Sequence, residues 1–343
     1  MHKTKSTIHG KKAVLYRVLP DKKVQCTACS HYCTILNGKT GICGVRKNIN
    51  GQLWLLVYGK PCSVNTDPIE KKPLYHFFPG TKIFSLGTFG CNFSCEFCQN
   101  WDISQYRKPK NIGHDLPPEK IIDYCTEHNI PSIAFTYNEP SIFFEYAFDI
   151  MKLAHQKNIK TVFVSNGYMS KEATERLFGH LDAINIDLKS FNPDFYKKVC
   201  KARLEPVLDN IKKLHKAGVW VEITTLVIPG ENDSKEELEQ IAGFVASIDK
   251  NIPWHISAFH PDYKMKDRDS TSIQKLNKAY EIGRKAGLNF VYTGNVHSSE
   301  YQNTYCQKCS NLLIQRTWHT ARNVDLLNGK CGKCGIDIPG VWQ

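Results

Sequence analysis

The sequence has no run of apolar residues long enough to cross a bilayer, which takes about 20 residues in a helix. Its first 17 residues are basic and polar without an apolar core, so we expect no secretory signal there. It also lacks a phosphate-binding P-loop and a dinucleotide-binding fingerprint, which leaves nucleotide hydrolysis without support. Collagen-like and low-complexity stretches are absent too. These absences favour a globular, cytoplasmic protein without a membrane partner.

The composition is that of a protein with a large core. The chain has 343 residues, of which 41% are hydrophobic and 23% charged, which allows two or three domains. It carries 45 Lys and Arg against 33 Asp and Glu, a formal net charge of +12. This basic balance suits an anionic ligand or partner but identifies none.

The 14 cysteines are the most informative residues. Cys62, Cys125 and Cys200 are isolated, and we expect them to be ordinary buried or surface thiols. The others fall into three clusters. Clustered cysteines in a reducing compartment bind metals or do redox chemistry more often than they form disulfides.

The C-terminal cluster predicts a structural metal site. It consists of two C-x2-C knuckles, and each knuckle offers two thiolates from one tight turn: Cys306, Cys309, Cys331 and Cys334. Four thiolates form the tetrahedral set that is usual for structural zinc. Iron is the alternative, because the softness of the thiolates does not separate the two metals.

The N-terminal cluster also offers four thiols, in a stretch with too little apolar material to fold by itself: Cys26, Cys29, Cys33 and Cys43. His31 lies among them as a substitute ligand. A bound metal would supply the folding free energy of this segment. The spacing leaves two alternatives open, structural zinc and an additional iron–sulfur cluster.

The middle cluster has three cysteines: Cys91, Cys95 and Cys98. Three thiolates on one loop complete no tetrahedral site, but they can hold three irons of a [4Fe–4S] cluster and leave the fourth iron open for a ligand. The loop follows a strand-like run at 82–86, and Gly87 and Gly90 give its backbone the freedom to wrap a cluster.

Strand-like and helix-like segments alternate through the remainder of the chain. The expected strands are 82–86, 132–136, 161–165, 183–187, 219–226 and 253–257, and 288–292 could add a seventh. Helix-start signals lie between them, such as the capping box Ser234-x-x-Glu237. This alternation predicts an α/β fold with a parallel sheet, with its chemistry at the carboxyl ends of the strands.

The pattern C-x3-C-x-aromatic-C after the first strand resembles the signature loop of the radical S-adenosylmethionine (SAM) enzymes. The resemblance implies a partial (β/α)6 TIM-like barrel, a [4Fe–4S] cluster on Cys91, Cys95 and Cys98, and SAM as a cofactor. It also implies three domains: a Cys-rich N-terminal module and lead-in at 1–75, the radical SAM core at 76–300, and a zinc-ribbon-like C-terminal module at 301–343.

The same resemblance implies a set of SAM contacts at the strand ends. Tyr137-Asn138-Glu139-Pro140 resembles a Gly-Gly-Glu-Pro-like motif that receives the amino group of SAM, although this chain has Tyr-Asn where the family often has two glycines. Taken singly, Asn138, Asn166 and Asp187 fit a cap or a turn better than a SAM contact. The implied contacts are Phe97 (adenine), Asn138 and Glu139 (amino group), Ser165 and Asn166 (near SAM), Asp187 and Lys189 (ribose and carboxylate), and His260 (ribose).

Over nearly its whole length the chain is similar to the radical SAM member of the AmmeMemoRadiSam system, a family near the pyruvate formate-lyase activating enzymes. The similarity includes Gly41-Ile42-Cys43-Gly44, the lead-in His76-Phe77-Phe78-Pro79-Gly80 and the C-terminal double knuckle. It implies an enzyme that reductively cleaves SAM to a 5′-deoxyadenosyl radical, which abstracts hydrogen from a substrate. The expected partners are a one-electron reductant such as flavodoxin or ferredoxin, a protein substrate, and AmmeMemo-system proteins.

Two alternatives stay open. The first is a radical SAM enzyme acting on RNA or a small molecule. The +12 charge and the two cysteine modules keep RNA open, but no aromatic RNA-binding signature appears. The second is a non-catalytic metal- or nucleic-acid-binding protein, which would leave the three-cysteine loop unexplained.

Overall fold

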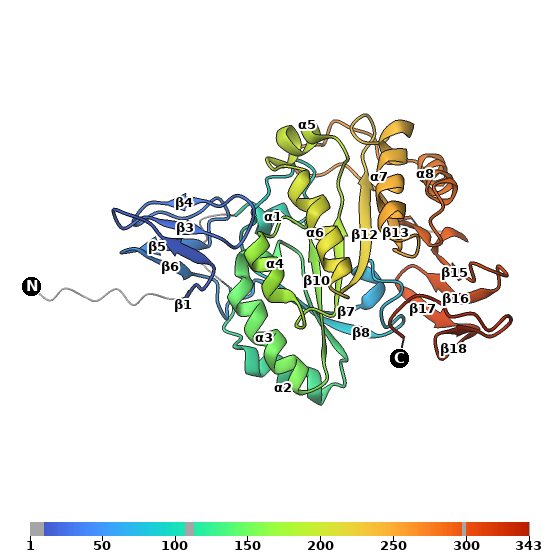
Figure 1. Cartoon of the computed structure of the whole chain (residues 1–343), viewed down its shortest axis with the longest axis horizontal. Coiled ribbons are helices and arrows are strands. Elements are labelled where there is room, and N and C mark those ends of the chain that lie inside the picture. The colour runs from blue at the N-terminus through green and yellow to red at the C-terminus, as the bar shows by residue number, and fades with distance from the viewer. Residues whose placement is uncertain (1–9, 107–112, 297–299, 343) are drawn as a thin grey trace, which may run out of the picture.

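The computed structural model describes residues 10–106, 113–296 and 300–342. An eight-stranded sheet forms its centre, with the strand order β14-β13-β12-β11-β10-β9-β8-β7 (Figure 1). β7 is antiparallel to β8, and each later strand pairs in parallel with the one before it. The strands are β7 (Ser63–Pro68), β8 (Lys82–Gly87), β9 (Ser132–Phe135), β10 (Lys160–Ser165), β11 (Ala183–Asp187), β12 (Trp220–Val227), β13 (Trp254–Ala258) and β14 (Val291–Gly294). The predicted α/β fold is confirmed, and the seventh apolar run does form a strand.

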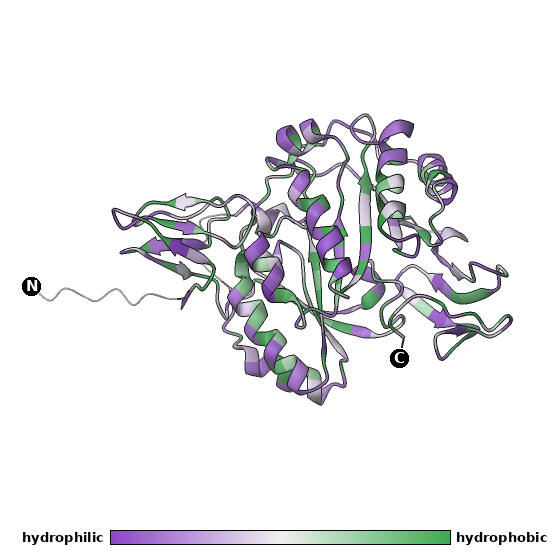
Figure 2. Cartoon of the chain, viewed as in Figure 1, coloured by the Kyte–Doolittle hydropathy of each residue, from purple (hydrophilic) through white to green (hydrophobic). Residues whose placement is uncertain are grey.

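Helices connect the parallel strands, so the carboxyl ends of these strands meet at one edge of the sheet. Three of the helices begin with a serine N-cap whose side chain accepts a backbone N–H of the first turn: Ser170, Ser234 and Ser272. In Figure 2 the helices carry both apolar and polar residues, as expected for elements with one buried face. The longer helices are α2 (Pro118–Glu127), α3 (Phe144–Gln156), α4 (Lys171–Leu177), α6 (Glu205–Lys216), α7 (Lys235–Ile248) and α8 (Ile273–Lys285). The shorter ones are η1 (Ile69–Lys71), α1 (Trp101–Ser104), η2 (Pro140–Phe143), α5 (Pro193–Phe195), η3 (Tyr196–Cys200) and η4 (Glu300–Gln302).

The N-terminal segment forms two small sheets at one end of the molecule (Figure 1). One contains β1 (Lys11–Lys12), β6 (Gln52–Leu55) and β5 (Arg46–Ile49), and the other β2 (Tyr16–Val18), β3 (Val24–Cys26) and β4 (Thr34–Ile35). Val24, Leu53 and Leu55 are buried in the same apolar cluster as the helices and strands of the core. The segment therefore packs on the core, and its last strand, β7, is part of the central sheet.

The C-terminal segment forms a small ribbon at the opposite end (Figure 1). Its strands are β15 (Thr304–Tyr305), β16 (Leu312–Thr317), β17 (Thr320–Asn323), β18 (Leu326–Leu327) and β19 (Lys330–Cys331). The lead-in segment docks on it: the buried His76 ring lies 2.7 Å from the Pro339 carbonyl and 2.6 Å from the Tyr292 hydroxyl. The Val341 amide also donates to the His76 carbonyl at 2.7 Å.

No helix within the described ranges has the length and apolar character needed to cross a membrane.

Candidate functional site

A cavity of about 530 Å³ opens at the carboxyl ends of the parallel strands. This volume lies in the usual range for a small-molecule or cofactor site. Most of the predicted site residues line it together: Cys91, Cys95, Phe97, Cys98, Asn138, Glu139, Ser165, Asn166, Asp187 and Lys189. Residues from the ends of β9, β10 and β11 are thus gathered around the three-cysteine loop that follows β8.

The three-cysteine loop presents its thiols to this cavity. Cys91 and Cys95 are buried and Cys98 is half-buried. The Phe93 amide donates to Cys91 Sγ at 3.4 Å, and Cys98 Sγ lies 3.1 Å from the Ser104 hydroxyl. Three converging thiols with polar hydrogens close to the sulfurs are a donor set that fits an iron–sulfur cluster with one open iron.

Gly90 explains how the loop can turn so tightly. Its φ of +89° is unfavourable for other residues, and a Cβ at this position would lie 2.3 Å from the Cys43 carbonyl oxygen. The N-terminal segment and the cluster loop are therefore in close backbone contact.

Cys200 is a neighbour of the cluster loop that the sequence reasoning missed. It lies at the end of η3, where its carbonyl accepts the Ser94 amide at 3.0 Å and its thiol is hydrogen-bonded to Cys95. This hydrogen bond lowers the pKa of Cys95, whereas burial raises the pKa of Cys91 and Cys98. No spacing in the sequence connects Cys200 with this loop.

Tyr137 occupies a backbone conformation that normally favours glycine, with φ at +69°. Strain of this kind costs about 1–3 kcal/mol and persists only where the surroundings hold the residue in place. Here the Tyr137 hydroxyl donates to Asp67 at 2.7 Å, and Lys72 stacks over the ring at 4.7 Å. The chain thus keeps the glycine-like turn of the motif and anchors it through β7.

Asn138 and Glu139 mainly hold neighbouring loops. The Asn138 amide donates to the Gly90 carbonyl at 2.8 Å, which ties the end of β9 to the cluster loop. The buried Glu139 carboxylate accepts the Asn166 amide at 2.9 Å, the Ser141 amide at 3.0 Å and the Ser165 hydroxyl at 3.0 Å. Burial raises the pKa of Glu139 in spite of these donors. Its side chain therefore positions the turn after β10.

Asp187 and Lys189 form an ion pair at the end of β11, with Nζ and Oδ2 2.8 Å apart. Burial disfavours the charged ammonium, but Asp187 and the nearby thiols outweigh it and raise the pKa of Lys189. Lys189 also lies over the Phe97 ring at 5.5 Å. One side of the cavity thus combines an aromatic face, a cation and a carboxylate.

His260 does not line the cavity with the other predicted residues. Its Nε2 accepts from the Gln99 amide at 2.9 Å, so it adjoins a residue of the cavity wall. His255 does line the cavity, but it is buried against Glu222 at 2.6 Å. Glu222 also accepts the amides of Tyr75 and His76, so His255 belongs to a structural network.

Trp318 and His319 are cavity residues that the sequence did not indicate. They form the turn between β16 and β17, so the C-terminal ribbon contributes one wall of the cavity. A contact between segments so distant in the chain follows from docking of the ribbon, which leaves no local sequence pattern.

The four C-terminal thiols have the geometry of a site for a single ion. Their sulfurs lie within 4.8 Å of one another, with 3.6 Å between Cys306 and Cys334 and between Cys309 and Cys331. A tetrahedral ZnS4 site with bonds of about 2.3 Å has sulfurs about 3.8 Å apart. The ligand set predicted from the sequence is thus assembled in a form that can hold a metal.

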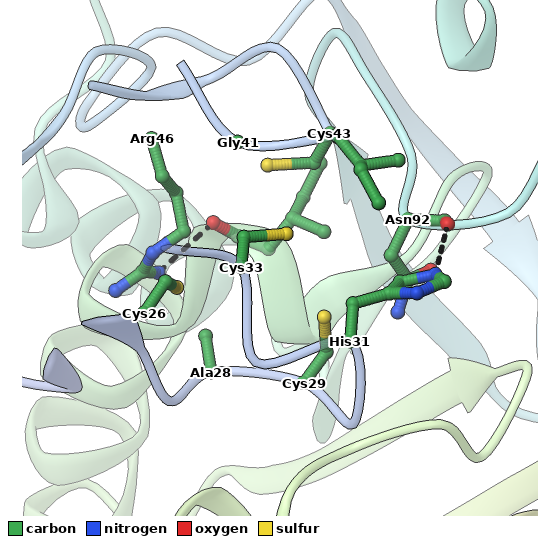
Figure 3. A pocket seen from close by; sticks show the side chains of 11 residues that line it. Cys26, Ala28, Cys29, His31, Cys33, Gly41, Cys43, Arg46 and Asn92 are labelled. Atoms are coloured by element: carbon green, nitrogen blue, oxygen red, sulfur yellow. Dashed lines mark hydrogen bonds between the residues drawn. The ribbon is translucent and has the colours of Figure 1, made fainter. Parts of the chain in front are cut away.

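The four N-terminal thiols surround a second, smaller cavity (Figure 3). Arg46 and Asn92 also line it. His31 Nε2 lies 2.9 Å from the Asn92 carbonyl, so this ring nitrogen is engaged elsewhere.

Comparison with known proteins agrees with the geometry. The sequence profile described as Radical SAM superfamily matches residues 85–245. An uncharacterized protein of Methanocaldococcus jannaschii is 44% identical over 333 residues, 96% of this chain and 99% of that protein. A pyruvate formate-lyase-activating enzyme of Clostridium pasteurianum is 24% identical over 203 residues, 55% of this chain and 84% of that enzyme.

Lower-identity relatives also include GTP 3′,8-cyclases. Among solved structures, a radical SAM methyltransferase from Sphaerobacter thermophilus superposes with a TM-score of 0.50 at 15% identity, covering 64% of this chain and 68% of that one. The profile spans the cluster loop and the strand ends that line the cavity. On this evidence the chain contains a radical SAM domain at residues 85–245.

Proposed function

We propose that this protein cleaves SAM reductively at a [4Fe–4S] cluster on Cys91, Cys95 and Cys98 and abstracts hydrogen from a protein substrate, as an enzyme related to the glycyl-radical activating enzymes. The observation that carries the proposal is the convergence of three thiols with Asp187, Lys189 and Phe97 on one cavity. When bound, the cluster and SAM supply the 5′-deoxyadenosyl radical; the protein supplies position and exclusion of solvent.

The side chains of the cavity have separate tasks in this proposal. Lys189 offers a cation to the SAM carboxylate, and Asp187 offers an acceptor to the ribose hydroxyls. Phe97 packs beside the adenine. Glu139 and Asn138 touch little of the ligand through their side chains and instead hold the turn at Ser165–Asn166 and the cluster loop in register. His260 acts through Gln99, and we assign it a positioning role.

A protein substrate is favoured by the relation to activating enzymes and by the cavity wall that the C-terminal ribbon contributes. The same proposal divides the chain into three domains, 1–75, 76–300 and 301–343, with a partial barrel for the core. It also includes zinc at the C-terminal thiols, a flavodoxin- or ferredoxin-type reductant, and AmmeMemo-system partners. The second candidate is a small-molecule substrate, which the cavity volume and the cyclase relatives favour.

Anaerobic reconstitution with iron and sulfide, followed by dithionite and SAM, tests the proposal. We expect 5′-deoxyadenosine from the wild type and from Cys62→Ala, a thiol outside the cavity, and none from Cys95→Ala. If the reconstituted wild type forms no 5′-deoxyadenosine, the proposal is wrong. Deuterium transfer from labelled proteins or labelled nucleotides into 5′-deoxyadenosine separates the two substrate classes.

A further inference from the structure

The N-terminal cysteine cavity has a geometry different from that of the C-terminal metal site. Within the described part of the chain, the C-terminal group alone brings three or more His, Cys, Asp or Glu ligand atoms within 4.8 Å of one another. The N-terminal sulfurs are more widely spaced, around a cavity of about 10 Å³ (Figure 3). A single zinc ion with bonds of about 2.3 Å requires sulfurs about 3.8 Å apart, a spacing that these four thiols do not reach as a set. Several irons bridged by sulfide accommodate a wider set of thiolates.

Two buried N–H donors at this cavity have no acceptor. Arg46 Nε and Asn92 Nδ2 are both buried without a hydrogen-bond partner, and both residues line the cavity. The other nitrogens of Arg46 donate to Glu145 at 2.6 and 2.9 Å and to the Ile142 carbonyl at 3.1 Å. Unsatisfied buried donors are rare in native proteins. The sulfides and thiolates of an iron–sulfur cluster are acceptors for such donors, and these contacts adjust its potential.

The N-terminal cavity adjoins the three-cysteine loop at Cys91, Cys95 and Cys98. Asn92 belongs to both, because it follows Cys91 in the loop and lines the N-terminal cavity. His31 is bound to the Asn92 carbonyl, and the Cys43 carbonyl contacts Gly90 so closely that a Cβ there would lie 2.3 Å away. Gly90 directly precedes Cys91, so this contact lies about 3.8 Å, one Cα–Cα step, from a ligand of the loop. A ligand of one site is therefore in near contact with a ligand of the other.

The module around this cavity is strongly basic. Residues 10–62 contain nine Lys or Arg and one acidic residue, Asp21, for a net charge of +8. The whole chain has +12, so most of the excess positive charge is concentrated here. Such a surface attracts an acidic protein partner and raises its association rate.

We propose that Cys26, Cys29, Cys33 and Cys43 hold a second [4Fe–4S] cluster, which passes electrons one at a time from an acidic, low-potential electron-carrier protein to the cluster loop at Cys91. In each transfer the carrier loses one electron, the second cluster goes from the 2+ to the 1+ state and returns to 2+ on reducing the loop cluster, and no proton or bond is exchanged. The relay rests on the proposed function, whereas the identity of the N-terminal cluster does not.

Metal analysis tests the cluster independently of activity. The full chain is reconstituted anaerobically as wild type, as Cys91→Ala/Cys95→Ala/Cys98→Ala, and as Cys62→Ala. We expect about eight irons in the wild type and in Cys62→Ala, and about four in the triple variant, with the Mössbauer signature of a four-iron cluster. A triple variant that contains zinc and no iron at the N-terminal thiols overturns the proposal.

Reduction kinetics test the relay. In Cys29→Ala/Cys33→Ala, about four retained irons and unchanged SAM binding by equilibrium dialysis establish that the core is folded. We expect reduced flavodoxin to reduce the loop cluster of this variant at least tenfold more slowly than that of the wild type, whereas dithionite reduces both at similar rates. Equal rates with flavodoxin refute the relay. Failure of the proposed function has a different signature: the loop cluster is reduced, but no 5′-deoxyadenosine forms.

Discussion

Replacement of Glu139 by glutamine should weaken both folding and SAM binding, although the residue hardly changes in shape. Its two oxygens accept the backbone amides of Ser141 and Asn166, one on each oxygen, and share the Ser165 hydroxyl. Glutamine has one oxygen and one NH2 group, so one amide must face another donor. Hydrogen bonds to a charged group contribute about 1.5–3 kcal/mol, and the donor left unpaired adds a desolvation cost. We therefore expect a loss of about 2–4 kcal/mol in the free energy of unfolding.

Part of this loss should appear in ligand affinity, because the released turn at Ser165–Asn166 must be re-formed when SAM binds. A cost of about 2 kcal/mol corresponds to an increase of about 30-fold in Kd. Urea denaturation gives the stability, and equilibrium dialysis of the reconstituted protein gives the SAM affinity.

Glu70→Gln is the matched control for the stability measurement. Glu70 is equally buried, but only one of its oxygens accepts a hydrogen bond, from the Gly80 amide at 2.7 Å, while Oε2 has no partner. Glutamine can keep this single bond through its oxygen, so we expect a change of less than about 1 kcal/mol. If the two variants lose the same stability, or if Glu139→Gln binds SAM as tightly as the wild type, the positioning role of Glu139 is refuted.

Three further predictions concern other parts of the molecule. Lys189→Met should raise the Kd of SAM by about tenfold, as expected for loss of one charge-assisted contact, at unchanged iron content; an unchanged Kd would exclude Lys189 from the SAM carboxylate. Cys306→Ser should lose one zinc per chain in elemental analysis and keep its iron, and retention of the zinc would show that it is bound elsewhere. Burial lowers the pKa of His76 to about 4, so the folded state holds this ring neutral while the unfolded chain is protonated below about pH 6.5. The free energy of unfolding should therefore fall by roughly 3 kcal/mol from this residue as the pH drops from about 6.5 to 4. Urea unfolding of His76→Asn should show a shallower fall with pH. Parallel pH profiles of the wild type and the variant would contradict the assignment.

The parts of the fold that follow from local pattern were predictable. The apolar runs at the strand positions, the serine caps of α4 and α7 and the clustered cysteines all express their structure within a few residues of chain. The grouping of Asp187, Lys189 and Asn166 followed from a general property of parallel sheets, because their carboxyl ends share one edge.

The residues that the sequence did not indicate depend on contacts between distant segments. Cys200 meets Cys95 because η3 turns back to the cluster loop, and Trp318 reaches the cavity because the C-terminal ribbon docks through His76. Tyr137 shows the converse case: a bulky residue adopts a glycine-like φ because Asp67 holds its hydroxyl 2.7 Å away. His260 follows the expected strand end, but it is hydrogen-bonded to the cavity residue Gln99 and does not line the cavity itself.

The turn of the C-terminal ribbon has a consequence for how the protein responds to metal supply. Trp318 and His319 stand at the cavity wall, and in the chain they lie between the two pairs of C-terminal thiols. If these thiols hold the proposed metal, its loss should leave the three-cysteine loop in place and remove part of the enclosure around it. A reactive species generated there would then be less shielded from solvent and from unintended hydrogen donors. Under the proposed function, metal starvation should therefore lower the selectivity of the reaction before it abolishes activity.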